Sequence, residues 1–135
     1  MKVVVSGSGT DLSSQVDPRF GRCPYYLIVD TDTMDFESIS NSANSSAHGA
    51  GIKAAQLVAS KGVEAVLTGN VGPNAYSALS ASSIKVISGI TGSVMDAVER
   101  FKRGEFNDAG GPTVRGHFGT GRKSSAQGKG RRRRL

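Results

Sequence analysis

The pattern that most constrains the fold is an alternation of short apolar runs with segments of helical periodicity along residues 2–103. Five runs have the length and composition of β-strands, and three segments have the spacing or end signals of helices. The predicted strands span residues 2–6, 25–30, 36–40, 63–68 and 84–88, and the predicted helices end near residues 61, 82 and 103. Strands that alternate with helices in this way are typical of an α/β fold.

The connections between these elements predict the strand order. The turn Thr31–Asp35 is short, which favours an antiparallel hairpin of the second and third strands. The run Val63–Thr68 is almost entirely apolar, so we expect it to lie centrally, with both faces covered. Two right-handed crossovers then link the third, fourth and fifth strands. The simplest result is a mixed five-stranded sheet of order 3-2-1-4-5, with strand 2 antiparallel and helices on both faces.

Particular residues mark the helix ends. Ser45 or Ser46 is placed to cap the first helix, which runs to Lys61, and Gly62 is placed to terminate it. Pro73 suits the first turn of the second helix. In the third helix an amphipathic stripe is formed by Val94, Ala97, Val98 and Phe101.

The predicted strand order places a binding crevice at one end of the sheet. The chain direction reverses between the first and fourth strands, and ligands of open α/β sheets bind at such a point, beyond the carboxyl ends of the strands. The loops Gly7–Asp11 and Gly69–Asn74 arrive there, and the second enters a helix N-terminus that favours an anion. The candidate anion-binding residues of this loop are Gly69, Asn70, Gly72 and Asn74; the alternative is a tight strand-to-helix turn without a ligand.

A second candidate loop is segment 16–26, Val-Asp-Pro-Arg-Phe-Gly-Arg-Cys-Pro-Tyr-Tyr, between the first two strands. Its prolines restrict the backbone, and Gly21 permits a conformation closed to other residues. Arg19 and Arg22 flank Phe20, so the loop presents two cations beside an apolar anchor. The alternative is that these arginines pair with acids of neighbouring loops such as Asp11 or Asp17.

Two further residues are candidate metal ligands. Cys23 is either a small buried hydrophobe or a thiolate ligand. His48 is either a surface or capping residue at a helix start or an imidazole ligand. Cys23 is the only cysteine, which excludes an intrachain disulfide and an all-cysteine metal site built from one chain.

Segment 16–26, together with Gly49-Ala-Gly-Ile52 and Gly69-Asn-Val-Gly-Pro-Asn-Ala75, closely resembles the dinitrogenase iron–molybdenum cofactor biosynthesis family, which comprises NifX-like proteins and the C-terminal part of NifB. The match covers roughly residues 1–105 in the family's order. The resemblance implies a three-layer, ribonuclease H-like α/β/α fold. It also implies a binding, carrier or storage protein for an anionic iron–sulfur or iron–molybdenum cofactor precursor cluster.

This implied role assigns functions to the candidate residues. Arg19, Arg22 and the helix N-terminus after Gly72 would complement the negative charge of the cluster, and Cys23 or His48 would add a direct ligand. Cluster donor or acceptor proteins and a second copy of the chain are the partners that such a role suggests.

The sequence does not favour catalysis. Nucleases of the ribonuclease H type need clustered carboxylates that hold two divalent ions, and neither central strand places an acid mid-strand facing another acid. No Ser/His/Asp set, metal-ligand spacing or Walker loop appears, so we predict a protein that is not an enzyme. Without a long apolar run or a leading signal, we expect it in the cytoplasm.

The net charge of +6 divides unevenly along the chain. Residues 114–135 contain no acid and eight cations, namely Arg115, Arg122, Lys123, Lys129, Arg131, Arg132, Arg133 and Arg134. From residue 109 the composition turns to Gly, Ser, Arg and Lys, so we predict a domain over residues 1–105 and a disordered basic tail over 106–135. The arginine run could contact a polyanion non-specifically. A nucleic-acid-associated protein and a small-anion sensor are therefore the alternatives to cluster binding.

Overall fold

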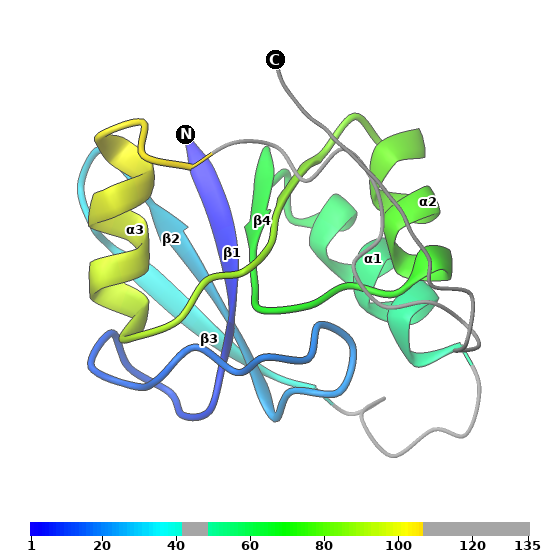
Figure 1. The fold of residues 1–135 in the computed structure, drawn as a ribbon, viewed down its shortest axis with the longest axis horizontal. Coiled ribbons are helices and arrows are strands. Elements are labelled where there is room, and N and C mark those ends of the chain that lie inside the picture. The colour runs from blue at the N-terminus through cyan, green and yellow to red at the C-terminus, as the bar shows by residue number, and fades with distance from the viewer. Residues whose placement is uncertain (42–48, 107–135) are drawn as a thin grey trace.

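The computed structural model describes residues 1–41 and 49–106, which form a five-stranded sheet between helices (Figure 1). The strands are β1 (Lys2–Gly7), β2 (Tyr25–Asp30), β3 (Phe36–Ser40), β4 (Ala65–Leu67) and β5 (Lys85–Ile87). The helices are α1 (Ala50–Ser60), α2 (Pro73–Ala81) and α3 (Val94–Lys102).

The sheet has the order β3-β2-β1-β4-β5, which confirms the predicted topology. β2 is antiparallel to both β1 and β3, whereas β4 is parallel to β1 and to β5. The five-residue turn after β2 allows only a direct antiparallel return. The parallel pairs are instead connected through α1 and α2, which carry the chain back to the starting edge of the sheet.

The helices cover both faces of the sheet, so the molecule has three layers (Figure 1). Successive residues of β1 point to opposite faces: Val4 joins the core under α1 and α2, whereas Val3 and Val5 join the core under α3. All three of these valines are fully buried. β1 therefore lies at the centre of the molecule, as an all-apolar strand must when helices cover both of its sides.

Several element ends differ from the sequence-based expectation. α1 begins at Ala50, with Gly49 as its N-cap in the left-handed region at φ 78°, and not at a serine cap further upstream. The expected caps, Ser45 and Ser46, lie outside the described residues. β4 and β5 are three residues each, shorter than predicted, although Glu64 and Thr68 beside β4 still donate backbone hydrogen bonds to Lys2 and Ile87 of the neighbouring strands. α3 begins after Ser93, whose hydroxyl accepts a hydrogen bond from the Asp96 N–H.

Some predictions fall outside the described part of the chain. These are the ligand role of His48 and the disordered state of the tail beyond residue 106. Among the residues that the structure does describe, no helix has the length and apolar character needed to cross a membrane.

Candidate functional site

Two loops meet at the carboxyl ends of β1 and β4. The loop that follows β1 crosses to the segment after β4, and both lie at the lower end of the molecule in Figure 1. The Phe20 N–H donates to the Asn70 carbonyl at 3.1 Å, and Arg19 forms a parallel bridge with Asn70. A Cβ atom added at Gly69 would lie 2.6 Å from the Cα atom of Pro18. Glycine is therefore needed at position 69 for the two loops to approach this closely.

The start of α1 completes this junction. A Cβ atom added at Gly21 would lie 3.0 Å from the Cα atom of Gly51, in the first turn of α1. On its other side, a Cβ atom at Gly51 would lie 3.0 Å from the Cβ atom of Ala75, in the first turn of α2. The three motifs that carry the family resemblance thus pack against one another, although they lie far apart in the sequence.

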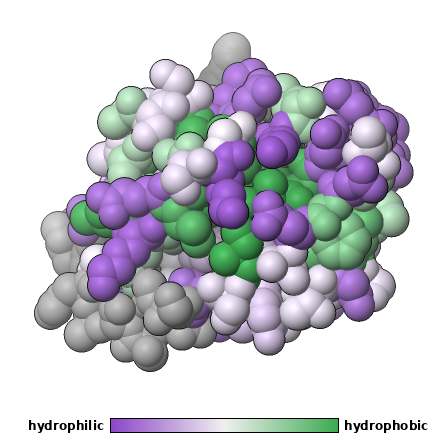
Figure 2. Space-filling view, turned by 180° about the vertical axis from the view of Figure 1, so that it is seen from behind, coloured by the Kyte–Doolittle hydropathy of each residue, from purple (hydrophilic) through white to green (hydrophobic). Residues whose placement is uncertain are grey.

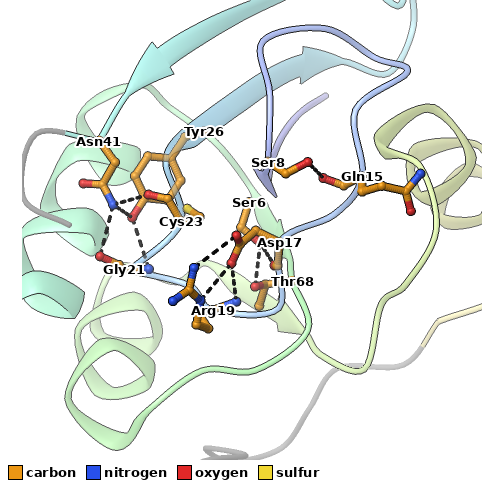
Figure 3. Close-up of polar contacts among 10 residues, drawn as sticks. All are labelled: Ser6, Ser8, Gln15, Asp17, Arg19, Gly21, Cys23, Tyr26, Asn41 and Thr68. Atoms are coloured by element: carbon orange, nitrogen blue, oxygen red, sulfur yellow. Dashed lines mark hydrogen bonds and ion pairs between the residues drawn. The ribbon is translucent and has the colours of Figure 1, made fainter. Parts of the chain in front are cut away.

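A pair of buried hydroxyl groups fastens the first loop to the sheet (Figure 3). Ser6 is the last residue but one of β1 and Thr68 follows β4, and their side-chain oxygens lie 2.7 Å apart. The Ser6 hydroxyl also donates to the Asp17 carbonyl at 2.6 Å, and the Asp17 N–H donates to the Ser6 carbonyl at 2.8 Å. Both hydroxyls are fully buried. Because each buried polar group has a partner, the loop gains a fixed position at little desolvation cost.

Arg19 is held by Asp17, which was one of the alternatives that the sequence left open. The Asp17 carboxylate is 7% exposed and accepts the Arg19 N–H at 2.9 Å. It also contacts the guanidinium Nε at 3.4 Å and one Nη at 3.5 Å. The Arg19 side chain is nevertheless 62% exposed. Asp17 therefore offsets part of the arginine charge and orients the guanidinium group at the surface.

Arg22 lies on the same tight turn as Arg19. Its N–H donates to the Arg19 carbonyl at 3.1 Å. Both arginines belong to the exposed surface of the loop, whereas Phe20 between them is buried and packs at a tilt against Tyr26, with ring centroids 5.5 Å apart. The loop thus presents cations outward on an apolar anchor, as predicted.

Cys23 lies beneath this loop and not on its surface. Its side chain is fully buried, and burial raises the pKa of the thiol to about 12. The thiol is consequently protonated at neutral pH, whereas a metal ligand must be a thiolate. Burial likewise raises the pKa of the neighbouring Tyr26. Cys23 as a ligand stays a prediction, and this environment disfavours it.

Asn41 fixes the shape of the loop from its buried side (Figure 3). Its Nδ2 group donates to the carbonyls of Gly21 and Cys23 at 3.0 and 2.8 Å and to the Tyr26 hydroxyl at 3.2 Å. The Tyr26 hydroxyl also accepts the Gly21 N–H at 3.1 Å. Since Asn41 is 6% exposed, these contacts serve the loop's internal structure and not a ligand.

The N-termini of α1 and α2 add backbone donors to this end of the molecule. α2 begins after Gly72 with Pro73 in its first turn, and neither a capping side chain nor an acid in that turn satisfies its N–H groups. α1 begins after Gly49 and likewise has no side-chain cap among the described residues. Each helix N-terminus carries about half a positive charge. The two helix starts and the arginine loop together favour an anion.

The structure brings together most, but not all, of the predicted site residues. Those that gather at the carboxyl ends of β1 and β4 are Arg19, Arg22, Gly69, Asn70, Gly72 and Asn74. Within the described parts of the chain, no three His, Cys, Asp or Glu side chains are arranged to hold a metal ion. The exposed Arg19 and Arg22 side chains and the start of α2, which has no side-chain cap, suit an anion held by charge and hydrogen bonds.

Sequence reasoning missed the residues that position the site. Ser6 and Thr68 lie side by side on the neighbouring strands β1 and β4, because each comes one residue after the paired residues Val5 and Leu67. The available signal was one hydroxyl residue directly after an apolar run in each of two predicted strands, Val3–Val5 and Ala65–Leu67. Asn41 had no comparable signal, because its partners lie 15 to 20 residues away in the chain.

Comparisons with known proteins agree with this architecture. A family model described as dinitrogenase iron–molybdenum cofactor matches residues 1–104. The apo form of the orange protein from Desulfovibrio gigas is 43% identical, with a TM-score of 0.81, over 84% of this chain and 96% of that one. A Thermotoga protein named as a candidate NifB protein is 38% identical, with a TM-score of 0.70, over 79% and 91%. An uncharacterized protein of Methanocaldococcus jannaschii is 33% identical over 96 residues, which are 69% of this chain and 81% of the relative.

Proposed function

The chain belongs to the dinitrogenase iron–molybdenum cofactor family, and on this premise we propose that it binds an anionic iron–sulfur or iron–molybdenum precursor cluster as a non-catalytic carrier or storage protein. The observation that carries this proposal is the convergence of the Arg19–Arg22 loop with the N-termini of α1 and α2. The name of one relative supports it, because an apo form implies a counterpart with a bound group.

Charge and hydrogen bonding would hold the cluster at this junction. Its anionic sulfur or oxygen atoms can accept hydrogen bonds from backbone N–H groups at the start of α2, near Asn74. Arg22 and the partly neutralised Arg19 would add positive charge. Because the site lies at the surface, water screens each of these contributions, and several must act together.

Direct ligation is the less supported part of the proposal. Cys23 would have to lose a proton from a thiol whose pKa is raised to about 12, and it would have to emerge from beneath the loop. His48 is the other proposed ligand. We therefore favour a cluster that retains its own sulfide ligands. Cluster donor proteins would deliver it, and acceptor proteins would remove it.

The test is to remove the two charges of the loop without disturbing its anchor. We expect Arg19→Gln with Arg22→Gln to weaken cluster retention by about 2- to 30-fold, the sum of two exposed ionic contributions. Glutamine at position 19 keeps a donor for the buried Asp17 carboxylate, so the melting temperature should change little. The measurement is anaerobic reconstitution with iron, sulfide and molybdate, followed by metal analysis and absorption spectroscopy.

A matched control removes two exposed cations elsewhere. Lys85→Gln with Lys102→Gln changes the net charge by the same amount. Lys85 starts β5 and Lys102 ends α3, so both lie away from the junction. Equal retention by both double variants would refute this loop as the anion site. Binding of inorganic phosphate with no retention of iron by the parent protein would instead support the small-anion alternative.

A further inference from the structure

The two edges of the sheet differ in their protection against a further strand. β5 has only three residues and begins with Lys85, and short edge strands and edge lysines both discourage pairing with another chain. β3 has five residues, contains neither lysine nor proline, and pairs with β2 in a continuous register without a bulge. It is the outermost strand of the sheet, and no described strand pairs with its outer side. The β3 edge is therefore open to an added strand.

The side chains of β3 are also uncovered. Four of its five residues are exposed, and Ile39 is partly buried. Phe36 is 40% exposed, although its side chain is large and apolar. Figure 2 views the molecule from behind, on the side of the β3 edge, and shows hydrophobic atoms bordered by hydrophilic ones. A strand added here would cover apolar surface as well as backbone groups.

The hydrogen bonds at the two ends of the β2–β3 hairpin fix its register. Before β3, the Asp30 N–H donates to the Asp35 carbonyl at 2.8 Å. After β3, the Asn41 N–H donates to the Pro24 carbonyl at 2.9 Å. Hydrogen-bonded pairs alternate with non-bonded pairs along an antiparallel ladder. The backbone groups at positions 35, 37, 39 and 41 therefore point towards β2.

The other backbone groups of β3 point away from the sheet. Glu37 and Ile39 pair with Ile28 and Tyr26 of β2 at the bonded positions. The N–H and carbonyl groups that alternate with them belong to Phe36, Ser38 and Ser40, and they face outward. The edge thus offers three donors and three acceptors, evenly spaced about a central serine.

These outward groups are complementary to a second copy of themselves. A two-fold axis at Ser38 places this residue opposite its own copy and places Phe36 opposite Ser40. Each outward N–H then faces an outward carbonyl, as a self-complementary interface requires. The same arrangement places Glu37 opposite Ile39, so no two like charges are directly opposed. The occupant that this edge fits by register is the same strand of another copy.

We propose that two copies of this chain pair antiparallel through β3, with the two-fold axis at Ser38, to form one continuous sheet. β3 runs parallel to β1, because each is antiparallel to β2. The carboxyl ends of β1 in the two copies consequently point in opposite directions, so both candidate anion sites stay open. One five-residue strand makes a small interface, and we expect a weak dimer that is populated at about 1 mM protein. This inference does not depend on the identity of the cluster.

Solvent exchange of backbone N–H groups in the full-length chain, measured by NMR at about 0.05 and 1 mM protein, tests the pairing. The three outward N–H groups of β3 should exchange about 2-fold more slowly once half of the chains are paired. The inward N–H groups of Glu37 and Ile39 should change little, since they already bond to β2. Outward groups that exchange at the same rate at both concentrations would overturn the proposal, including when they are slow at both.

The other edge of the sheet provides the internal control. The Lys85 N–H and the Ile87 carbonyl bond to the β4 side, so Val86 between them points outward from β5. Its exchange rate should not depend on protein concentration. Equal slowing at Val86 and in β3 would indicate general association and would contradict a specific β3 interface.

Ser38→Pro removes the central outward donor without removing a hydrogen bond between β2 and β3. Proline is tolerated at edge positions whose N–H points away from the sheet. We expect the variant to fold and to lose the concentration dependence of exchange at Phe36 and Ser40. Retention of that dependence by the folded variant would overturn pairing about Ser38.

Charge variants at the same position test the two-fold axis and replace the proline variant if it does not fold. Ser38→Lys and Ser38→Glu each oppose like charges across the axis, so each should weaken pairing by about 2- to 10-fold. An equimolar mixture of the two should restore pairing, because opposite charges then meet. Thr91→Lys with Thr91→Glu, at an exposed position beyond β5, is the matched control and should show no such recovery.

A Ser38 mixture that pairs no better than either variant alone would overturn the proposed axis, and so would equal recovery in the Thr91 control. Sedimentation velocity measures pairing in these mixtures. Cluster retention by the Ser38 variants should equal that of the parent, because β3 lies away from the candidate anion site. Loss of pairing and loss of cluster binding are therefore separate outcomes.

Discussion

Close packing around Gly69 decides whether the two loops of the candidate site can meet. We expect Gly69→Ala to destabilise the protein by about 1–3 kcal/mol, because its Cβ atom would lie 2.6 Å from the Pro18 Cα atom and the backbone has to move. The displaced loop should also retain less cluster. Chemical denaturation and metal analysis measure the two effects.

Gly89→Ala is the matched control for Gly69→Ala. Gly89 has φ 75° but open space around its Cα atom, so alanine there costs stability through backbone strain alone. Cluster retention by folded Gly89→Ala protein should equal that of the parent. If Gly69→Ala retained as much cluster as Gly89→Ala, contact of the two loops would not matter for binding.

The buried thiol of Cys23 predicts how stability depends on alkaline pH. The pKa rises from 9.0 to about 12 on folding, mainly through burial, so the folded state holds this proton more tightly than the unfolded state. The resulting stabilisation is complete below pH 9 and is lost as the pH rises towards 12. Urea unfolding at several pH values should therefore show stability falling over this interval.

Cys23→Ala separates the contribution of the thiol to this pH dependence from that of Tyr26. Burial also raises the pKa of the Tyr26 hydroxyl. The variant should show a shallower decline of stability above pH 9 than the parent. An unchanged decline would mean that the thiol is not protected in the folded state. In that case the buried environment would no longer argue against Cys23 as a thiolate ligand.

At the scale of elements, a negative charge added at the N-terminus of α2 should have opposite effects on protein stability and on cluster binding. Asn74 lies in the exposed first turn, which has no acid and no side-chain cap. Asn74→Asp should stabilise the helix by about 0.3–1 kcal/mol through its dipole. The same carboxylate should repel an anionic cluster and lower its retention.

Ser80→Asp, in the last turn of the same helix, provides the reverse comparison. A negative charge there opposes the helix dipole, so stability should fall slightly while cluster retention stays unchanged. Thermal unfolding and metal analysis of the two variants test this pairing. Cluster retention that is the same in both would place the anion site away from α2.

At the scale of the whole molecule, Phe106 is the last residue that the structure describes, and it tests the predicted domain boundary near residue 105. Its ring lies 4.8 Å from the Arg100 guanidinium carbon and packs against the core beneath α3. A chain that ends at Phe106 should therefore keep the helix and strand signals and the melting temperature of the full-length protein. A chain that ends at Gly104 should be less stable by about 1 kcal/mol, because it loses this partly buried aromatic contact.

Circular dichroism and thermal unfolding of the two truncated chains measure the difference. Loss of structure in the chain that ends at Phe106 would show that the basic tail contributes to folding, contrary to the predicted domain boundary near residue 105. The same chain, compared with the full-length protein, also shows whether the tail affects assembly with iron and sulfide.

The sequence by itself determined the architecture of this protein. Apolar runs and helical periodicities located the five strands and three helices of residues 1–41 and 49–106, and the short turn 31–35 required the antiparallel pairing of β2 with β3. Local signals suffice here because the spacing of apolar residues and the length of a connection can be read from a few neighbouring positions in the sequence. The motif at 16–26 and the loop at 69–75 could likewise be predicted to meet, since strand order alone brings them to one edge.

Only the tertiary structure decided which candidate residues are exposed at the candidate site and which are buried beneath it. The pairing of Arg19 with Asp17, the burial of Cys23 and the anchoring of the loop by Asn41 depend on neighbours that the fold supplies. The start of α1 at Ala50 was also missed, because a left-handed glycine and contact with Gly21 outweigh the capping preference of serine. Burial and hydrogen bonding are properties of a packed environment, so residue type and spacing determine where a side chain can lie but not what surrounds it.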